Sequence, residues 1–172
     1  TGGSSLVGGH DSEPCVQSSL CEKLGCSHGG IGGMKTYGGN QNGYSTIYGV
    51  ITHPTEVGSR AAAGGNNGGG AVRIVASSLV EIGSQGIVSA DAGGSTTGAS
   101  SGGSVLLIAP RIVSHGIISA EGGPTLCGDC GNGGGGRIAL YTDDLLMSAA
   151  AQVSVADGRA SRSGTTGHPG GA

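Results

Sequence analysis

Apolar residues in this chain occur in short runs, and between Ala71 and Gly158 these runs follow one order three times. Each unit opens with an apolar run that follows a Gly-rich tract. It closes with a second apolar run that ends in an acidic residue. Runs of about four to six residues suit β-strands and are too short for helices, and Gly, Ser, Asn and Pro border them as they border strands. The pattern predicts short strands in three consecutive units. The opening runs are 71–76, 104–109 and 136–141, and the closing runs are 87–91, 117–121 and 153–157.

The spacing of the units predicts a repeat architecture. Ala90, Ala120 and Ala156, taken as equivalent positions, lie 30 and 36 residues apart. Repeats of about 20–50 residues are typical of solenoids, propellers and arrays. We therefore expect an all-β fold, a glycine-rich β-solenoid or β-helix in which short strands stack about 4.8 Å apart on their equivalents in the next coil. The sequence does not set the handedness of the coil.

Other apolar stretches extend this pattern. Leu79–Gly83 and Ile112–Gly116 predict a further short strand within the first two units. In the third unit, Asp143–Gln152 contains Leu and Ala runs that indicate a helical turn or a closing cap.

The composition restricts how such a body is packed. Of 172 residues, 40 are Gly and 4 are Tyr, while Trp and Phe are absent. Aromatic side chains normally supply much of a buried core, so the core here must consist of Val, Ile, Leu and Ala. Glycine adopts positive φ and permits close backbone approach. We expect the long Gly tracts to provide turns and to pack as extended, polyproline-II-like segments through backbone hydrogen bonds.

Three regions follow from these patterns. Residues 1–26 form a Cys-containing N-terminal segment or loop insertion, because this part is the least repetitive. Residues 27–158 form the glycine-rich β-solenoid repeats. Residues 159–172 are a Gly/Ser/Thr-rich tail or the start of a further rung. The first residue is Thr1, without a charged and apolar leader, which predicts a processed chain or a segment of a longer one.

The charge pattern argues against two classes of partner. The formal net charge is −3, 11% of residues are charged, and no Lys/Arg cluster is present. Nucleic-acid binding therefore lacks its usual electrostatic footprint. No apolar run approaches the ~18 residues that a membrane span requires, so we expect no membrane insertion in this segment.

The five cysteines are disulfide candidates, and they indicate an extracellular or cell-surface location. Their odd number predicts two intrachain disulfides plus one thiol that stays reduced or bonds a neighbouring chain. The C-x-x-C pair admits a redox pair, half a zinc site or a disulfide. We favour the disulfide, because the pair lies in a Gly loop and further Cys ligands are distant. The candidates are Cys15, Cys21, Cys26, Cys127 and Cys130.

Two further motifs have simpler explanations than catalysis or metal binding. Gly25–Gly29 matches the G-x-S-x-G nucleophile pattern around Ser27, but the required strand before it and helix after it are not predicted. We expect no catalytic residue and no cofactor. His10, His28 and His53 lack metal-ligand spacing, and hydrogen bonds to loop backbone are the expected role.

Asp91, Glu121 and Asp157 each follow a closing run and predict one column of carboxylates. Calcium turns carry several oxygen ligands per repeat, whereas this pattern supplies one. The expectation is a solvated column or pairing with Arg side chains. The candidate arginines are Arg73, Arg111, Arg137 and Arg159.

The order of the landmarks from Ser27 to Thr142 resembles the glycine-rich repeat region of large extracellular or cell-surface proteins of plants, algae and other protists. That resemblance implies a structural or adhesive extracellular body and carries over no catalytic residue. The landmarks are Ser27-His28-Gly29-Gly30-x-Gly32-Gly33, Tyr48-Gly49, Pro54-Thr55-Glu56-Val57-Gly58-Ser59, Ala71-Val72-Arg73-Ile74, the Ile-Ser-Ala-Glu/Asp units and Arg137-Ile138-Ala139-Leu140-Tyr141.

Two functions remain open at this point. The first is a structural, non-enzymatic segment or subunit of an extracellular glycine-rich fibre, filament or cell-surface stalk, whose partners are copies of itself or neighbouring segments of one long chain. The alternative is an ice- or polysaccharide-binding, adhesive module that uses a flat solenoid face. Ser95-Thr96-Thr97 and Thr165-Thr166 raise this alternative, although Thr does not recur in every unit.

Overall fold

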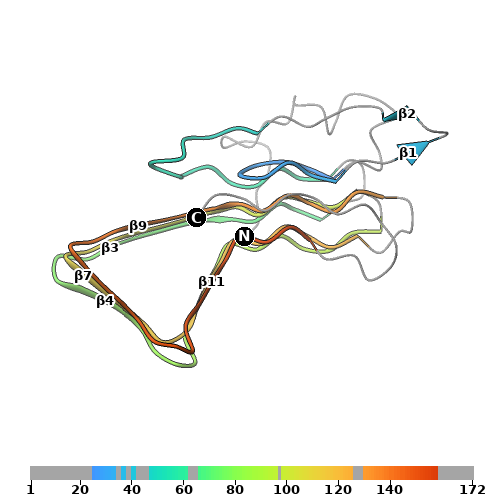
Figure 1. Cartoon of the computed structure of the whole chain (residues 1–172). Helices are drawn as coiled ribbons and strands as arrows, with labels where there is room; N and C mark the ends of the chain where they lie inside the picture. Colours follow the sequence, from blue (N-terminus) through green and yellow to red (C-terminus); the bar gives the residue numbers. More distant parts are fainter. Residues whose placement is uncertain are drawn as a thin grey trace.

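The computed structural model describes residues 25–33, 36–37, 40–41, 47–61, 66–96, 98–125 and 130–158. These residues form an all-β protein of short strands, without a helix (Figure 1). Among them, no helical segment has the length and hydropathy to cross a membrane.

Three consecutive units contain the strands β3 to β11. Each unit contributes a five-, a four- and a three-residue strand in that order. A short antiparallel pair, β1 (Thr36–Tyr37) and β2 (Asn40–Gln41), lies apart from them. Unit 1 is β3 (Ala71–Val75), β4 (Leu79–Ile82) and β5 (Ile87–Ser89); unit 2 is β6 (Ser104–Ile108), β7 (Arg111–Ser114) and β8 (Ile117–Ser119); unit 3 is β9 (Arg137–Tyr141), β10 (Asp144–Met147) and β11 (Gln152–Ser154).

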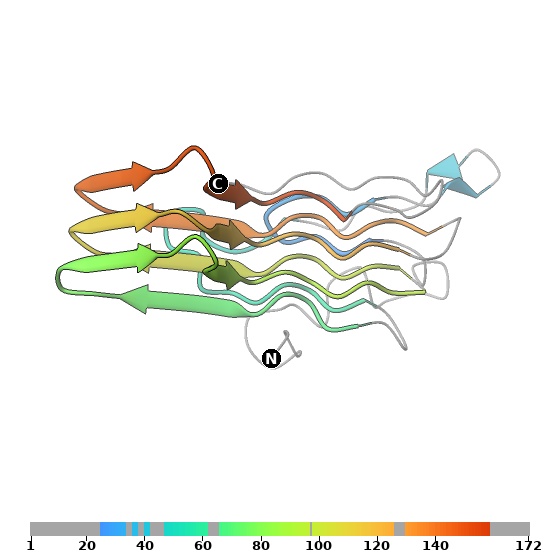
Figure 2. The same cartoon turned by 90° about the horizontal axis from the view of Figure 1, so that it is seen from below.

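Each strand pairs with the equivalent strand of the next unit, and every such pair is parallel. The result is three three-stranded sheets, ordered β3-β6-β9, β4-β7-β10 and β5-β8-β11. The sheets enclose a triangle in Figure 1, and the units lie one above another in Figure 2. One turn of chain per unit is consistent with a β-solenoid.

The core lies inside this triangle and consists of stacked aliphatic columns. Register places Val105 between Val72 and Ile138, and Leu107 between Ile74 and Leu140. The side chains of unit 2 are sealed by the units on either side: Val105, Leu107, Ile112 and Ile118 are all 0% exposed. Full burial of one such side chain contributes roughly 1.5–3 kcal/mol. The expectation of an aliphatic core is met without Phe or Trp.

Gly-rich segments extend from the triangle and lie side by side (Figure 2). Backbone hydrogen bonds join them: Gly133 N donates to Gly123 O over 3.0 Å, and Gly158 N donates to Gly133 O over 2.9 Å. We call these stacked segments the glycine array. Its described parts are 25–33, 58–61, 66–70, 90–96, 98–103, 120–125, 130–136 and 156–158. Backbone hydrogen bonds thus take the place of side-chain packing in this half of the molecule.

Glycine is needed in the array because neighbouring backbones are too close for a side chain. A Cβ on Gly133 would lie 1.7 Å from Ser100 O, and a Cβ on Gly25 would lie 1.7 Å from Asn132 O. Real Cβ atoms essentially never approach another heavy atom within 3.0 Å. Among the described residues only Gly49 has positive φ, at 86°. Turning at positive φ is therefore seen at one described glycine, and the expected close approach of backbones is the main role of the others.

The register corrects one predicted equivalence. Ser154 pairs with Ser119, so Val155, and not Ala156, follows at the position of Ala120. Ala156 takes the position of Glu121, because Gly122 N donates to Ala156 O just as Ala92 N donates to Glu121 O. Asp157 is consequently one residue out of line with the other two acids.

The expected helical turn in Asp143–Gln152 is also wrong. Residues 144–147 form β10 instead, paired with β7 along its whole length. The free edge of β7 offers backbone hydrogen-bond partners to residues 144–147. A single helical turn is unstable in water on its own, so strand pairing is favoured. Tertiary pairing therefore overrides the local preference of the Leu and Ala runs.

We expect Gly133→Ala to destabilise the fold by about 1–3 kcal/mol or more, since overpacking costs this much and the new methyl meets fixed backbone. Gly83→Ala is the matched control, because a Cβ there meets nothing within 4 Å, and its effect should stay within about 1 kcal/mol. Urea unfolding followed by circular dichroism measures both. Equal unfolding midpoints for the two variants would contradict the close-packing role.

Candidate functional site

The principal buried polar cluster surrounds His28, beside the sheet β3-β6-β9. The His28 ring is 0% exposed. Its Nδ1 lies 2.9 Å from Gly102 O, and because a carbonyl only accepts, Nδ1 carries the proton. The ring stacks on Tyr48, with centroids 4.8 Å apart and planes at 30°. The hydrogen bond and the stack fix the orientation of the imidazole.

Arg137 and Glu56 bring opposite charges to this cluster. Arg137 is buried at the start of β9, and its Nη2 donates to Tyr48 O over 2.7 Å. Gly49 shows where Glu56 lies: a Cβ there would be 3.0 Å from Glu56 Oε2 and 3.4 Å from His28 Nε2. The carboxylate and the imidazole therefore face the same point above Gly49.

Hydrogen bonds attach residues 48–59 to this cluster. Tyr48 OH donates to Val57 O over 2.7 Å, and Ser59 Oγ donates to Tyr48 OH over 3.0 Å. Ser104 Oγ, at the start of β6, donates to Glu56 O over 2.6 Å. This segment runs along the outside of the sheet β3-β6-β9 (Figure 1). The cluster therefore joins a separate chain segment to the stacked strands.

Two buried nitrogens in the cluster, His28 Nε2 and Arg137 Nε, have no hydrogen-bond partner among the described residues. Burial lowers the pKa of His28 below its ordinary 6.5, and the Arg137 charge lowers it further, while the Gly102 carbonyl and the Glu56 carboxylate oppose the shift. The imidazole is neutral at pH 7 as a result. A neutral imidazole is buried at a lower cost in free energy than a charged imidazolium would be.

Ser27 is buried beside His28, and its Oγ accepts a hydrogen bond from Gly32 N over 2.9 Å. No helix follows it in residues 28–33, whereas a nucleophile elbow opens a helix and exposes its serine. The hydroxyl supports the local backbone in this arrangement.

Of the three predicted histidines, the structure describes His28 and His53. His53 lies on the outer segment, with its ring centroid 6.3 Å from that of Tyr141, while His10 is outside the described residues. Where the structure is described, no group of three His, Cys, Asp or Glu side chains is placed to hold a metal ion.

The acids of units 1 and 2 bond serines, where a solvated column or Arg pairing was expected. Asp91 Oδ2 accepts from Ser89 Oγ over 2.7 Å and from Ser119 Oγ over 2.8 Å. Asp91 Oδ1 accepts from Glu121 N over 2.6 Å, and Glu121 in turn accepts from Ser154 Oγ. Serine recurs at one register position in every unit and supplies these partners. Asp91 is exposed, as the solvated alternative expected, and Arg159 lies outside the described residues. This serine–carboxylate ladder pins one unit to the next.

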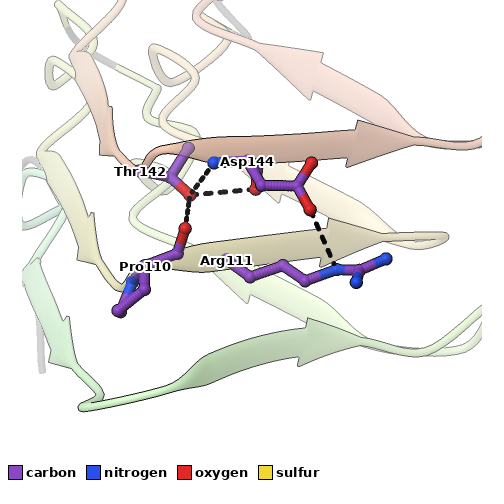
Figure 3. A network of polar contacts seen from close by, with 4 residues as sticks. All are labelled: Pro110, Arg111, Thr142 and Asp144. Atoms are coloured by element: carbon purple, nitrogen blue, oxygen red, sulfur yellow. Dashed lines mark hydrogen bonds and ion pairs between the residues drawn. The ribbon is translucent and has the colours of Figure 1, made fainter.

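A second polar link between units lies at the corner after β9 (Figure 3). Thr142 Oγ1 is 3.1 Å from Pro110 O and 2.9 Å from Asp144 O. Arg111 Nε lies 3.3 Å from Asp144 Oδ2, and both side chains are more than half exposed. An exposed ion pair contributes little to stability, so the threonine and backbone bonds are the more important part of this link.

The disulfide candidates are only partly visible. Cys15, Cys21 and Cys127 lie outside the described residues, and Cys26 and Cys130 are fully buried. Cys26 Sγ donates to Arg60 O over 3.2 Å, and Cys26 packs with Ala61. Cys26 also lies within the glycine array, since its N donates to Ala99 O over 2.9 Å. The disulfide pairing and the boundary at residue 26 stay predictions.

Tyr48, Glu56 and Arg137 were not predicted as partners of His28. The sequence did mark these three residues, because each is a large aromatic or charged side chain in or beside a Gly-rich tract. Their meeting depends on contacts across as many as 89 residues of sequence. Local pattern reading has no access to pairing over such distances.

No family model, curated protein or solved structure matches this chain.

We expect acid to destabilise the fold through His28. Its folded pKa lies below the unfolded 6.5, so the unfolded state binds more protons as pH falls below 6.5, and stability is lost at up to ~1.4 kcal/mol per pH unit. Urea midpoints measured between pH 7.5 and 5 should fall less steeply in His28→Gln than in the parent. His115→Gln, at a partly exposed turn, is the control and should keep the parental slope. An unchanged slope in His28→Gln would exclude this role.

Proposed function

We propose that the chain is a glycine-rich β-solenoid that serves as a structural, non-enzymatic element of an extracellular fibre, filament or cell-surface stalk. One observation carries the proposal: all three sheets repeat in parallel register from unit to unit. Such bodies lengthen by adding units, because each repeat contacts only its neighbours.

The direction of the hydrogen bonds supports a structural role. Bonds between parallel strands run across the strands, which is along the axis on which the units stack. The glycine array adds bonds in the same direction, such as Gly122 N to Ala156 O at 2.9 Å. Tension along the axis would therefore act on many backbone hydrogen bonds together.

The polar cluster supports a non-enzymatic reading. His28 is sealed from solvent, and Arg137 donates to backbone. Catalysis requires groups that reach a substrate, and these side chains hold segments of the chain together instead. The cysteine content supports an extracellular location. The proposed partners are further copies or neighbouring segments of one long chain, together with glycans at the surface.

The alternative, an ice- or polysaccharide-binding face, has less support. Such a face needs a regular Thr row, whereas Thr does not recur in every unit and the outward columns of the described sheets are mixed. One column holds Arg73, Leu106 and Ala139, and another holds Leu79, Arg111 and Asp144. The Ser95–Thr125 bridge brings two hydroxyl residues together outside these sheets, and both residues are buried.

Fibre diffraction of aligned native material tests the proposal. Strands stacked along the fibre axis should give a reflection at ~4.8 Å parallel to that axis. Electron microscopy of the same material, with and without reductant, should show filaments or long stalks and should reveal whether disulfides join their subunits. Compact particles without the ~4.8 Å reflection would contradict a fibre or stalk role.

A further inference from the structure

Exposed apolar side chains gather at the two ends of the stack. Among the described residues, the large exposed apolar side chains belong to unit 1, unit 3 and the loop at 47–51, and none belongs to unit 2. At unit 3 the contrast is clear within a single column. Leu145 of unit 3 is 48% exposed, while Ile112 beneath it is 0% exposed. The end surface at unit 3 therefore resembles the interior contact between units, opened to solvent. At unit 1 the exposed apolar residues, Val75, Leu79 and Ile87, occupy outward positions, while the inward Val80 and Ile82 are 8% and 5% exposed.

The two ends are complementary when one is placed on the other. If unit 1 of a second copy followed unit 3 at the existing register, every inward column would pair apolar with apolar. Inside the chain the same columns already make such contacts, except at Ser114. The five new pairs would be Ile138 with Val72, Leu140 with Ile74, Leu145 with Val80, Met147 with Ile82, and Val153 with Val88.

The strand edges further restrict which partner can dock on the ends of the stack. Unit 3 presents three parallel edges of five, four and three residues, arranged as a triangle. Unit 1 has strands of the same lengths in the same order. An exposed edge is a template for another strand, and all three edges are satisfied together by a body with this same triangular path.

We propose that unit 3 of one copy docks on unit 1 of a second copy and continues all three sheets in register; this inference rests on the proposed function. This contact is head-to-tail, so it does not close and produces a growing filament. It also defines outward neighbours across the joint: Leu79 of one copy would lie over Asp144 of the other, and Glu81 would lie over Leu146.

A matched pair of leucines tests the apolar contact. Leu145 and Leu146 are adjacent in β10 and are 48% and 49% exposed. Leu145→Lys places an ammonium against the interior column of the next copy and should weaken association at least ~10-fold, which corresponds to ~1.4 kcal/mol. Leu146→Lys places the same charge over Glu81 and should leave association unchanged or stronger. Sedimentation velocity over a concentration series of the full chain measures the association.

Leu79 provides a second test that does not disturb the core, because its side chain points outward and is 43% exposed. Leu79→Asp would face Asp144 of the neighbouring copy, and the like charges should weaken association at least ~10-fold. Leu79→Lys should retain it. Circular dichroism spectra and urea midpoints of each variant establish that the fold is intact.

The proposal is supported if association rises with concentration and the paired variants separate as described. It is overturned if the parent chain stays monomeric at all concentrations, as it would if residues 159–172 or a further unit of a longer chain covered the end. It is also overturned if both members of a pair behave alike. The two proposals can be told apart. If the chain is monomeric in solution but native fibres still show the ~4.8 Å axial reflection, the docking of unit 3 on unit 1 is refuted and the structural role is retained.

Discussion

The structure depends on how closely glycine backbones pass one another. At Gly133, Gly25 and Gly131 a Cβ would lie less than 2 Å from a carbonyl oxygen of the neighbouring segment. At such separations Cα–H groups approach carbonyls directly, which adds weak attraction to the N–H···O bonds. A side chain at these positions would push adjacent segments apart. The glycine array, and with it half of the fold, exists only because these positions carry no side chain.

The strand columns and the glycine array stack along the same axis. This shared axis restricts the places where the units can differ in length. The strands keep lengths of five, four and three residues in every unit. The offset from β3 to β6 and from β6 to β9 is 33 residues, while β5 to β8 is 30 and β8 to β11 is 35. The extra residues are accommodated at the corners and within the Gly-rich tracts. Strand columns and glycine segments can therefore rise together even though the repeat is irregular.

The sequence predicted the strands well because their signal is local. Short apolar runs with turn residues on either side determine β-strands wherever an edge is available, and Arg137–Tyr141 is an example. Register was less accessible: Val155 occupies the predicted position of Ala156, a difference that only the pairing of Ser154 with Ser119 reveals. The serine partners of Asp91 and the cluster around His28 were missed for the same reason, since both are built from residues distant in sequence.

The His28 cluster has a specific place in this design. It lies where the glycine array meets the triangle, because Gly102 lies two residues before the start of β6 and Arg137 begins β9. Glycine segments offer no side chains with which to hold an outer layer, so residues 48–59 need polar anchors at this junction. Burying His28 Nε2 and Arg137 Nε without partners costs free energy, and the bonds from Arg137 and Ser104 to backbone offset that cost. A chain with almost no aromatic residues therefore uses a buried polar joint where other folds use a hydrophobic contact.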